Sequence, residues 1–218
     1  MKDFAVIFDM DGVIVNNSEY HTQAWHAFCD KYAGPLTEED FRLHILGRNN
    51  RDTLSYIFKR DMTDEEINQY GEEKESLYRE LYTPHIKATP HLYDFLELLR
   101  KNNINTSIAT SADRPNVDFV LNALDIREYF SSITDTSAVT HSKPDPEIYL
   151  AAAQTISYGP SRCIVIEDTV SGIRAGKAAG MKVIAITTTH GKEDLQEADF
   201  IIDDFDQLSS DTLRRLLA

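Results

Sequence analysis

Short apolar runs recur along the chain, and segments with a helical spacing of apolar residues lie between them. The first run is Phe-Ala-Val-Ile-Phe at residues 4–8. Runs of this length without polar alternation are typical of strands buried on both faces of a sheet. We therefore expect strands at residues 4–8, 105–110, 131–134, 163–166, 182–186 and 200–202. Strands that alternate with helices predict βαβ units and a parallel sheet.

The segment from residue 16 to about residue 81 shows helical patterns only. Apolar residues recur there at i, i+3, i+4 and i+7, as in Trp25, Phe28, Cys29 and Tyr32. A Thr-x-x-Glu capping box at residues 63–66 predicts the start of a further helix. We expect an α/β protein whose doubly wound parallel sheet comes from residues 1–15 and 82–218. A helical bundle at residues 16–81 would be inserted as a cap.

Two aspartates follow the first strand directly. Asp9 and Asp11, with Gly12 after them, would lie at the C-terminal edge of the sheet, where ligands bind in open α/β folds. Neighbouring carboxylates repel each other, and a hard cation such as Mg²⁺ relieves the repulsion. These residues alone are equally compatible with a solvated turn closed by Gly12.

Polar residues also follow other expected strands, and a parallel sheet brings them to the same edge. They are Thr110 with Ser111, Lys143 in a loop with two prolines, and Glu167 with Asp168. Acids, a lysine and a hydroxyl together form a cation site beside an anion site, which phosphoryl transfer requires. Each group also has a structural alternative: a solvated lysine, a loop hydroxyl, and acids that cap the following helix.

Composition narrows the classes of function. The 218 residues carry a formal net charge of −14, which argues against nucleic-acid and anionic-membrane partners. No apolar run approaches the ~20 residues of a membrane span, and the N-terminus lacks the features of a secretory signal. Cys29 and Cys163 lie far apart in sequence, so we expect free thiols in a reducing cytoplasm. We expect a monomer. The negative charge still allows a small anionic substrate, because a metal and one lysine can reverse the sign locally.

The motifs, taken in order, resemble motifs I to IV of the haloacid dehalogenase superfamily. They are Asp9-Met-Asp11-Gly-Val, Thr110-Ser111, Lys143-Pro144 and Glu167-Asp168. Residues 16–25, 142–146 and 167–173 resemble local signatures of its β-phosphoglucomutase-like branch. The resemblance covers essentially the whole chain. It implies a Rossmann-like core with a helical cap after the first strand.

The resemblance assigns a role to each motif. Asp9 would be the nucleophile that forms an aspartyl-phosphate. Asp11 would protonate the leaving oxygen and then activate the incoming water or alcohol. Ser111, or Thr110 in its place, would hydrogen-bond the phosphoryl group, and Lys143 would neutralise its charge.

The resemblance also implies a Mg²⁺ site and a contribution from the cap. The ion would be held by Asp9, by Asp168 and by the backbone carbonyl of Asp11. Glu167 would lie beside them as a ligand or as a partner of the ligands. His21 would help to position the substrate. The alternative for His21 is an ordinary half-buried helix histidine.

The cap loop departs from the mutase pattern. In β-phosphoglucomutases a Lys-Gly pair and a following arginine bind the distal phosphate of a sugar bisphosphate. Here Leu46-Gly47 replaces that pair and Asn50 stands at the arginine, with Arg48 and Arg51 as alternative cations. We expect Gly47, Arg48, Asn50 and Arg51 to select the substrate.

Loss of the lysine favours a hydrolase over a mutase. We predict a Mg²⁺-dependent phosphatase that hydrolyses a small phosphorylated metabolite, such as a sugar phosphate, through an aspartyl-phosphate. The alternative is a β-phosphoglucomutase that interconverts β-glucose 1-phosphate and glucose 6-phosphate. A further alternative is an inorganic pyrophosphatase.

Overall fold

The chain divides into two compact units. The computed structural model describes residues 4–45 and 50–218. One unit comprises Met1–Asn16 with Ile86–Ala218, and the other comprises Asn17–His85. The apolar pattern predicts an insert that ends at residue 81, whereas its last helix continues to Tyr82 and a 3₁₀ turn carries the chain on to His85. The helical unit is therefore slightly longer than its apolar pattern indicates.

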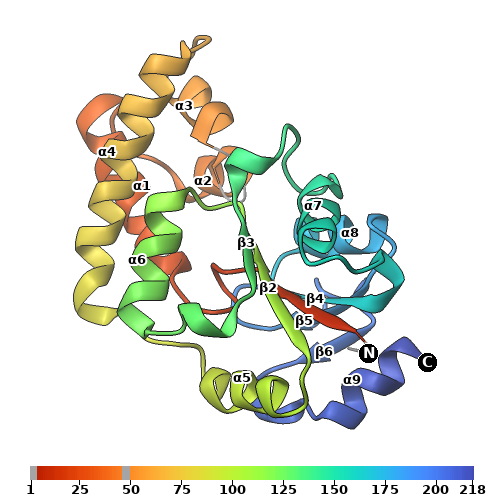
Figure 1. The fold of residues 1–218 in the computed structure, drawn as a ribbon. Helices are drawn as coiled ribbons and strands as arrows, with labels where there is room; N and C mark the ends of the chain where they lie inside the picture. The colour runs from red at the N-terminus through yellow and green to blue at the C-terminus, as the bar shows by residue number, and fades with distance from the viewer. Residues whose placement is uncertain (1–3, 46–49) are drawn as a thin grey trace. The chain divides into compact units, whose positions relative to one another are not determined.

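A six-stranded parallel sheet forms the centre of the first unit (Figure 1). Its order is β3-β2-β1-β4-β5-β6, so the first strand of the chain lies inside the sheet. The chain moves outward from β1 in one direction and then returns to extend the sheet from β4 in the other. This change of direction makes the β1–β4 boundary a topological switch point. The strands are β1 (Ala5–Phe8), β2 (Asn105–Ala109), β3 (Ser132–Thr134), β4 (Cys163–Glu167), β5 (Lys182–Ile186) and β6 (Phe200–Ile202).

Helices cover both faces of this sheet, which confirms the predicted doubly wound α/β fold. Side chains of α7 and α8 pack on one face, against alternate strand residues such as Ala5 and Ile7. The opposite face carries Phe8, whose ring contacts Phe95 of α5. The helices of this unit are α5 (Leu92–Lys101), α6 (Arg114–Leu124), α7 (Glu147–Thr155), α8 (Val170–Ala178) and α9 (Ser210–Leu217).

An aromatic cluster fixes β1 from the α5 side. The Phe8 ring lies 6.0 Å from the Phe95 ring and 5.7 Å from the Phe130 ring, between centroids. Phe205, in the turn after β6, stacks on Phe95 at 5.2 Å. Phe8 is the last residue of β1, so this cluster holds the strand directly beneath Asp9.

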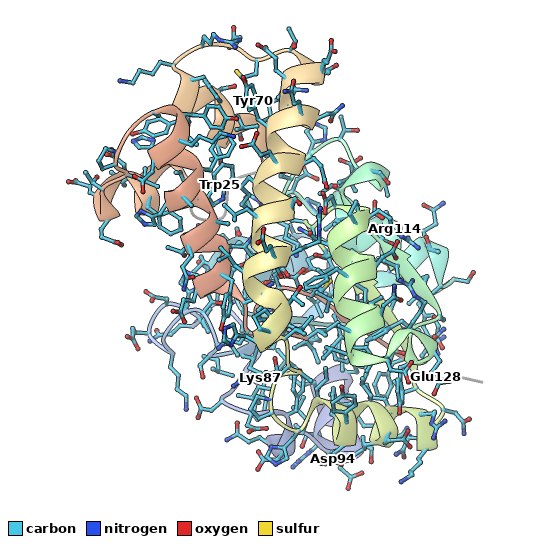
Figure 2. All side chains as sticks on the ribbon, turned by 90° about the vertical axis from the view of Figure 1, so that its left-hand side faces the viewer. Trp25, Tyr70, Lys87, Asp94, Arg114 and Glu128 are labelled. Carbon is cyan, nitrogen blue, oxygen red and sulfur yellow. The ribbon has the colours of Figure 1, made fainter. Side chains whose placement is uncertain are left out.

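The second unit is helical throughout the part that the structure describes. Its helices are α1 (Ser18–Tyr32), α2 (Glu38–His44), α3 (Asn50–Phe58) and α4 (Asp64–Tyr82). Trp25 on α1 and Tyr70 on α4 project from two helices that pack side by side (Figure 2). The Tyr70 ring contacts Phe28 and Phe58 in the aromatic core of this unit. The predicted capping box is confirmed, because the Thr63 and Glu66 side chains cap each other's backbone N–H groups.

Two further expectations can be compared with the structure. Cys29 and Cys163 are buried free thiols, as expected. Within residues 4–45 and 50–218, no helix combines the length and the apolar character that crossing a membrane needs.

The aromatic cluster leads to a first prediction. Replacing Phe95 with alanine should lower the free energy of unfolding by about 3–5 kcal/mol, because it opens a cavity against Phe8 and Phe205. Leu150→Ala on the exposed face of α7 is the matched control and should change it by less than about 1 kcal/mol. Urea unfolding followed by circular dichroism measures both. Equal losses in the two variants would contradict the assignment of Phe95 to the core.

Candidate active site

The two aspartates of the first motif lie where the sheet switches direction. The Asp9 backbone N–H donates to the carbonyl of Ile166 at 3.0 Å, which continues the β1–β4 pairing by one residue. Asp9 is therefore beside Glu167, the last residue of β4. The Asp9 side chain is buried, whereas Asp11 is half-buried. One carboxylate is thus enclosed and the other remains open to solvent.

A buried lysine lies between two of the acids. Lys143 Nζ is 2.6 Å from Glu167 Oε1 and 3.0 Å from Asp9 Oδ1. The contact with Asp9 is an ion pair rather than a well-aligned hydrogen bond. The Lys143 side chain is only 7% exposed, so it is not the solvated lysine that the sequence left open. The ammonium also lies 5.0 Å from the centre of the Tyr149 ring.

Glu167 is held by donors at both carboxylate oxygens. Oε1 accepts hydrogen bonds from Lys143 Nζ and from the Tyr149 hydroxyl, each at 2.6 Å. Oε2 accepts from the backbone N–H of Asp168 at 3.0 Å, and from the backbone N–H and hydroxyl of Thr169. Glu167 therefore combines local hydrogen bonds, just before α8 begins, with a long-range ion pair.

Burial and neighbouring charges shift the pKa values of Lys143 and of the clustered acids. Burial raises the pKa of Asp9 to about 7, with further increases from Glu167 and Asp11 and an opposing effect from Lys143. Burial, Glu167 and Asp9 raise the pKa of Asp168 well above its usual range. Burial alone would raise the pKa of Glu167, but Lys143 outweighs it and the pKa is lowered. Burial likewise opposes protonation of Lys143, but Asp9 and Glu167 raise its pKa.

These observations test whether the residues fit a metal ion. One carboxylate oxygen from each of Asp9, Glu167 and Asp168 lies within 4.8 Å of the others. Asp168 Oδ1 is buried without a hydrogen-bond partner among the described residues. A single lysine cannot balance three buried acids, and a hard divalent cation prefers carboxylate oxygens. The donor set therefore fits Mg²⁺.

Glycines create the space that these carboxylates occupy. A Cβ on Gly12 would lie 1.9 Å from Asp168 Oδ2, and the φ of Gly12 is +78°. A Cβ on Gly172 would lie 1.8 Å from Glu167 Oε1. The Gly in Asp-x-Asp-Gly is thus needed for close approach as well as for its backbone conformation.

The loop after β5 supports the same residues, which the sequence did not indicate. The Thr188 hydroxyl donates to the Gly12 carbonyl, and His190 Nδ1 lies 3.1 Å from the Asp168 carbonyl. From its sequence context alone, His190 is an ordinary surface or packing residue. No motif marks these positions, because the contacts join segments that are far apart in sequence.

The hydroxyl pair after β2 divides into two environments. Thr110 is buried, and its hydroxyl accepts a hydrogen bond from the backbone N–H of Ala112 at 3.1 Å. Ser111 is exposed. Thr110 therefore orders the turn, and Ser111 is the exposed member of the pair.

The expected substrate-binding residues of the cap lie in the helical unit. His21 Nδ1 is 2.9 Å from Lys74 Nζ, and its ring stacks on Tyr78 with 3.7 Å between centroids. Lys74 is buried, and it donates to Glu75 Oε1 at 2.9 Å. Burial lowers the pKa of His21 to about 3, with a contribution from Lys74, so the imidazole is neutral. Lys74 and Glu75 belong to a glutamate-rich helix, in which no local pattern indicates a buried ion pair.

The predicted selectivity loop is only partly described. Gly47 and Arg48 lie outside the described residues. Arg51 forms an ion pair with Asp64, and Asn50 Nδ2 donates to Glu75 Oε1 at 3.4 Å. Both described residues therefore contact acids within the helical unit.

Sequence comparison decides the family. Residues 6–186 match the family described as haloacid dehalogenase-like hydrolase. The chain belongs to this family. It is an enzyme of the phosphohydrolase type, and phosphomutases are among its relatives.

Two related proteins and one crystal structure illustrate what this chain is similar to. A phosphorylated carbohydrates phosphatase of Thermotoga maritima is 32% identical over 184 residues, covering 83% of each chain. A β-phosphoglucomutase of Bacillus subtilis is 32% identical over 192 residues, covering 84% of this chain and 82% of that one. The crystal structure of a HAD hydrolase, family IA, variant 3, from Entamoeba histolytica superposes with a TM-score of 0.90 at 32% identity. The superposition covers 98% of this chain and 99% of the Entamoeba chain.

The close approach of Gly12 to Asp168 gives a second prediction. Gly12→Ala should weaken Mg²⁺ binding at least about tenfold, because the new Cβ displaces the Asp168 carboxylate. Gly34→Ala is the control, since Gly34 also has a positive φ, of +91°, but open space around its Cβ position. Isothermal titration calorimetry with Mg²⁺ measures both. Equal affinities for the two variants would show that the close approach to Asp168 is unimportant.

Proposed function

We propose that this protein is a Mg²⁺-dependent phosphatase that hydrolyses a small phosphorylated metabolite, such as a sugar phosphate, through an aspartyl-phosphate on Asp9. The observation that carries the proposal is the buried Lys143 ammonium between Asp9 and Glu167, beside Asp168. A buried lysine at a cluster of acids supplies the anion site next to the cation site. The Thermotoga phosphatase supports a phosphorylated carbohydrate as the substrate class.

In the first step, a carboxylate oxygen of Asp9 attacks the phosphorus of the substrate. The new O–P bond forms as the bond to the leaving oxygen breaks, and Asp11 gives that oxygen a proton. Asp11 suits this role because it is half-buried and separated by one residue from the nucleophile. Lys143 and Ser111 hold the phosphoryl oxygens while charge develops on them.

In the second step, water replaces the leaving group. Asp11, now ionised, removes a proton from the water, whose oxygen attacks phosphorus and releases phosphate from Asp9. Mg²⁺ would be held by the carboxylates of Asp9 and Asp168 and by the backbone carbonyl of Asp11, with Glu167 beside them. When bound, the ion offsets carboxylate and phosphoryl charge and favours the ionised form of Asp9.

A mutase is the second candidate, supported by the Bacillus β-phosphoglucomutase. A mutase must bind the distal phosphate of a bisphosphate, which needs a second cationic group. Arg51 already pairs with Asp64, and Lys74 already pairs with Glu75. Among the described residues, these two ion pairs occupy the cations that could bind a distal phosphate, which favours a hydrolase over a mutase. Inorganic pyrophosphate is a further candidate substrate. We also propose a cytoplasmic monomer, in keeping with the free thiols and the acidic composition.

The nucleophile assignment gives a third prediction. Asp9→Asn should lower kcat for phosphate release by at least about 10³-fold, because an amide oxygen is a poor nucleophile. Asp125→Asn is the control, since Asp125 ends α6 in a left-handed conformation that asparagine accepts, and it should retain full activity. Phosphate release in the presence of Mg²⁺ measures both. An Asp9→Asn enzyme with near-parental kcat would exclude the aspartyl-phosphate route.

Product analysis separates the candidate activities and gives a fourth prediction. Sugar monophosphates should yield stoichiometric inorganic phosphate and free sugar, and chelation of Mg²⁺ should abolish the reaction. Parallel assays would use β-glucose 1-phosphate, nucleotides and pyrophosphate, with ³¹P spectra to detect isomerised product. Glucose 6-phosphate formed from β-glucose 1-phosphate without net phosphate release would replace the phosphatase with the mutase.

A further inference from the structure

A tyrosine that no motif marks lies against the buried lysine. Tyr149 is in the first turn of α7 and is fully buried. Its ring packs in the apolar cluster between α7, α8 and the sheet. Phenylalanine would satisfy that cluster equally well, and a buried hydroxyl is costly unless it has a partner. The partner is Glu167 Oε1, to which the Tyr149 hydroxyl donates at 2.6 Å.

The same tyrosine contacts both members of the ion pair. Glu167 Oε1 also accepts from Lys143 Nζ at 2.6 Å, so one oxygen is shared by the hydroxyl and the ammonium. The Lys143 ammonium lies 5.0 Å from the centre of the Tyr149 ring, within range of a cation–π interaction. Tyr149 therefore limits the movement of Lys143 both through Glu167 and through its own ring.

The intervening loop is ordered by backbone contacts. The Asp145 N–H donates to the Ser142 carbonyl at 3.0 Å, and the Tyr149 N–H donates to the Pro146 carbonyl at 3.1 Å. Asp145 Oδ1 accepts from the Glu147 N–H at 3.0 Å. The loop that carries Lys143 and the helix that carries Tyr149 thus form one connected support.

We propose that Tyr149 is a positioning residue for Lys143. Its hydroxyl fixes Glu167 Oε1, and its ring faces the ammonium, so that Lys143 Nζ stays within reach of both Glu167 and Asp9. The proposal rests on the proposed phosphatase function, in which Lys143 must meet the phosphoryl group at Asp9. Tyr149 does not touch the reacting atoms in this mechanism.

The direction of the effect follows from the shared oxygen. Without the hydroxyl, Glu167 Oε1 would keep Lys143 as its only donor among the described contacts, and the ammonium would move toward Glu167 and away from Asp9. A small displacement of a charged group weakens stabilisation of the transition state more than it weakens substrate binding. The loss should therefore appear in kcat rather than in KM.

The experiment compares Tyr149→Phe with the parent enzyme and with Tyr158→Phe. Tyr158 is a partly buried tyrosine on the edge of the same apolar cluster, which makes Tyr158→Phe a matched control. We expect Tyr149→Phe to lower kcat for a sugar phosphate about tenfold or more, with KM within about twofold. Tyr158→Phe should leave both constants unchanged. Tyr149→4-aminophenylalanine keeps a donor on the ring and should restore most of kcat.

A structural readout separates this proposal from the proposed function. In crystals of Tyr149→Phe, the distance from Lys143 Nζ to Asp9 Oδ1 should exceed the 3.0 Å of the parent. If the parent releases no phosphate from any substrate, the proposed function fails, and this distance still tests the positioning role. A folded Tyr149→Phe with parental kcat and an unchanged distance would overturn the proposal. A Tyr149→Phe that cannot fold, with no recovery by 4-aminophenylalanine, would also overturn it, because the hydroxyl would then serve stability alone.

Discussion

The site depends on one buried ammonium shared by two carboxylates. Lys143 Nζ contacts both Asp9 and Glu167 inside a nearly closed environment. Removing charges from water is costly, and mutual attraction offsets the cost only where the geometry is good and the remaining polar atoms are hydrogen-bonded. Glu167 meets this condition through its donors at both oxygens, whereas Asp168 Oδ1 does not. Among the described residues, the clustered carboxylates of Asp9, Glu167 and Asp168 form a donor set of the kind that a divalent cation prefers.

The parallel sheet makes this arrangement geometrically simple. Asp9, Glu167 and the 110–111 turn come from segments more than fifty residues apart. Each lies at the C-terminal end of a strand whose neighbours run in the same direction. At the β1–β4 switch point the hydrogen bonds of the sheet continue without interruption, and open α/β folds bind their ligands outside such points. Helices supply the other half of the site. The turn before α8 orients Glu167 through the backbone N–H groups of Asp168 and Thr169, and the first turn of α7 places Tyr149 against Lys143.

The helical unit carries a second buried ion pair, in which one lysine meets one carboxylate rather than a cluster of acids. Lys74 and Glu75 are adjacent in sequence and neutralise each other, while burial and Lys74 keep His21 uncharged. The charges of Lys74 and Glu75 therefore cancel locally, whereas the three clustered acids of the core site face a single lysine.

The sequence by itself determined the order of elements, the parallel α/β class and the identity of the acids, because strand and helix periodicities are local and the strand-end motifs follow them directly. It could not show that Lys143 is buried or that Arg51 pairs with Asp64. Nor could it show that the Thr110 hydroxyl accepts a backbone hydrogen bond while Ser111 is exposed. It also contained no signal for Tyr149, Thr188, His190 or Lys74. Those properties arise from contacts between residues distant in the chain, and from the low dielectric that burial creates. Only the tertiary structure brings such groups together and excludes water from between them.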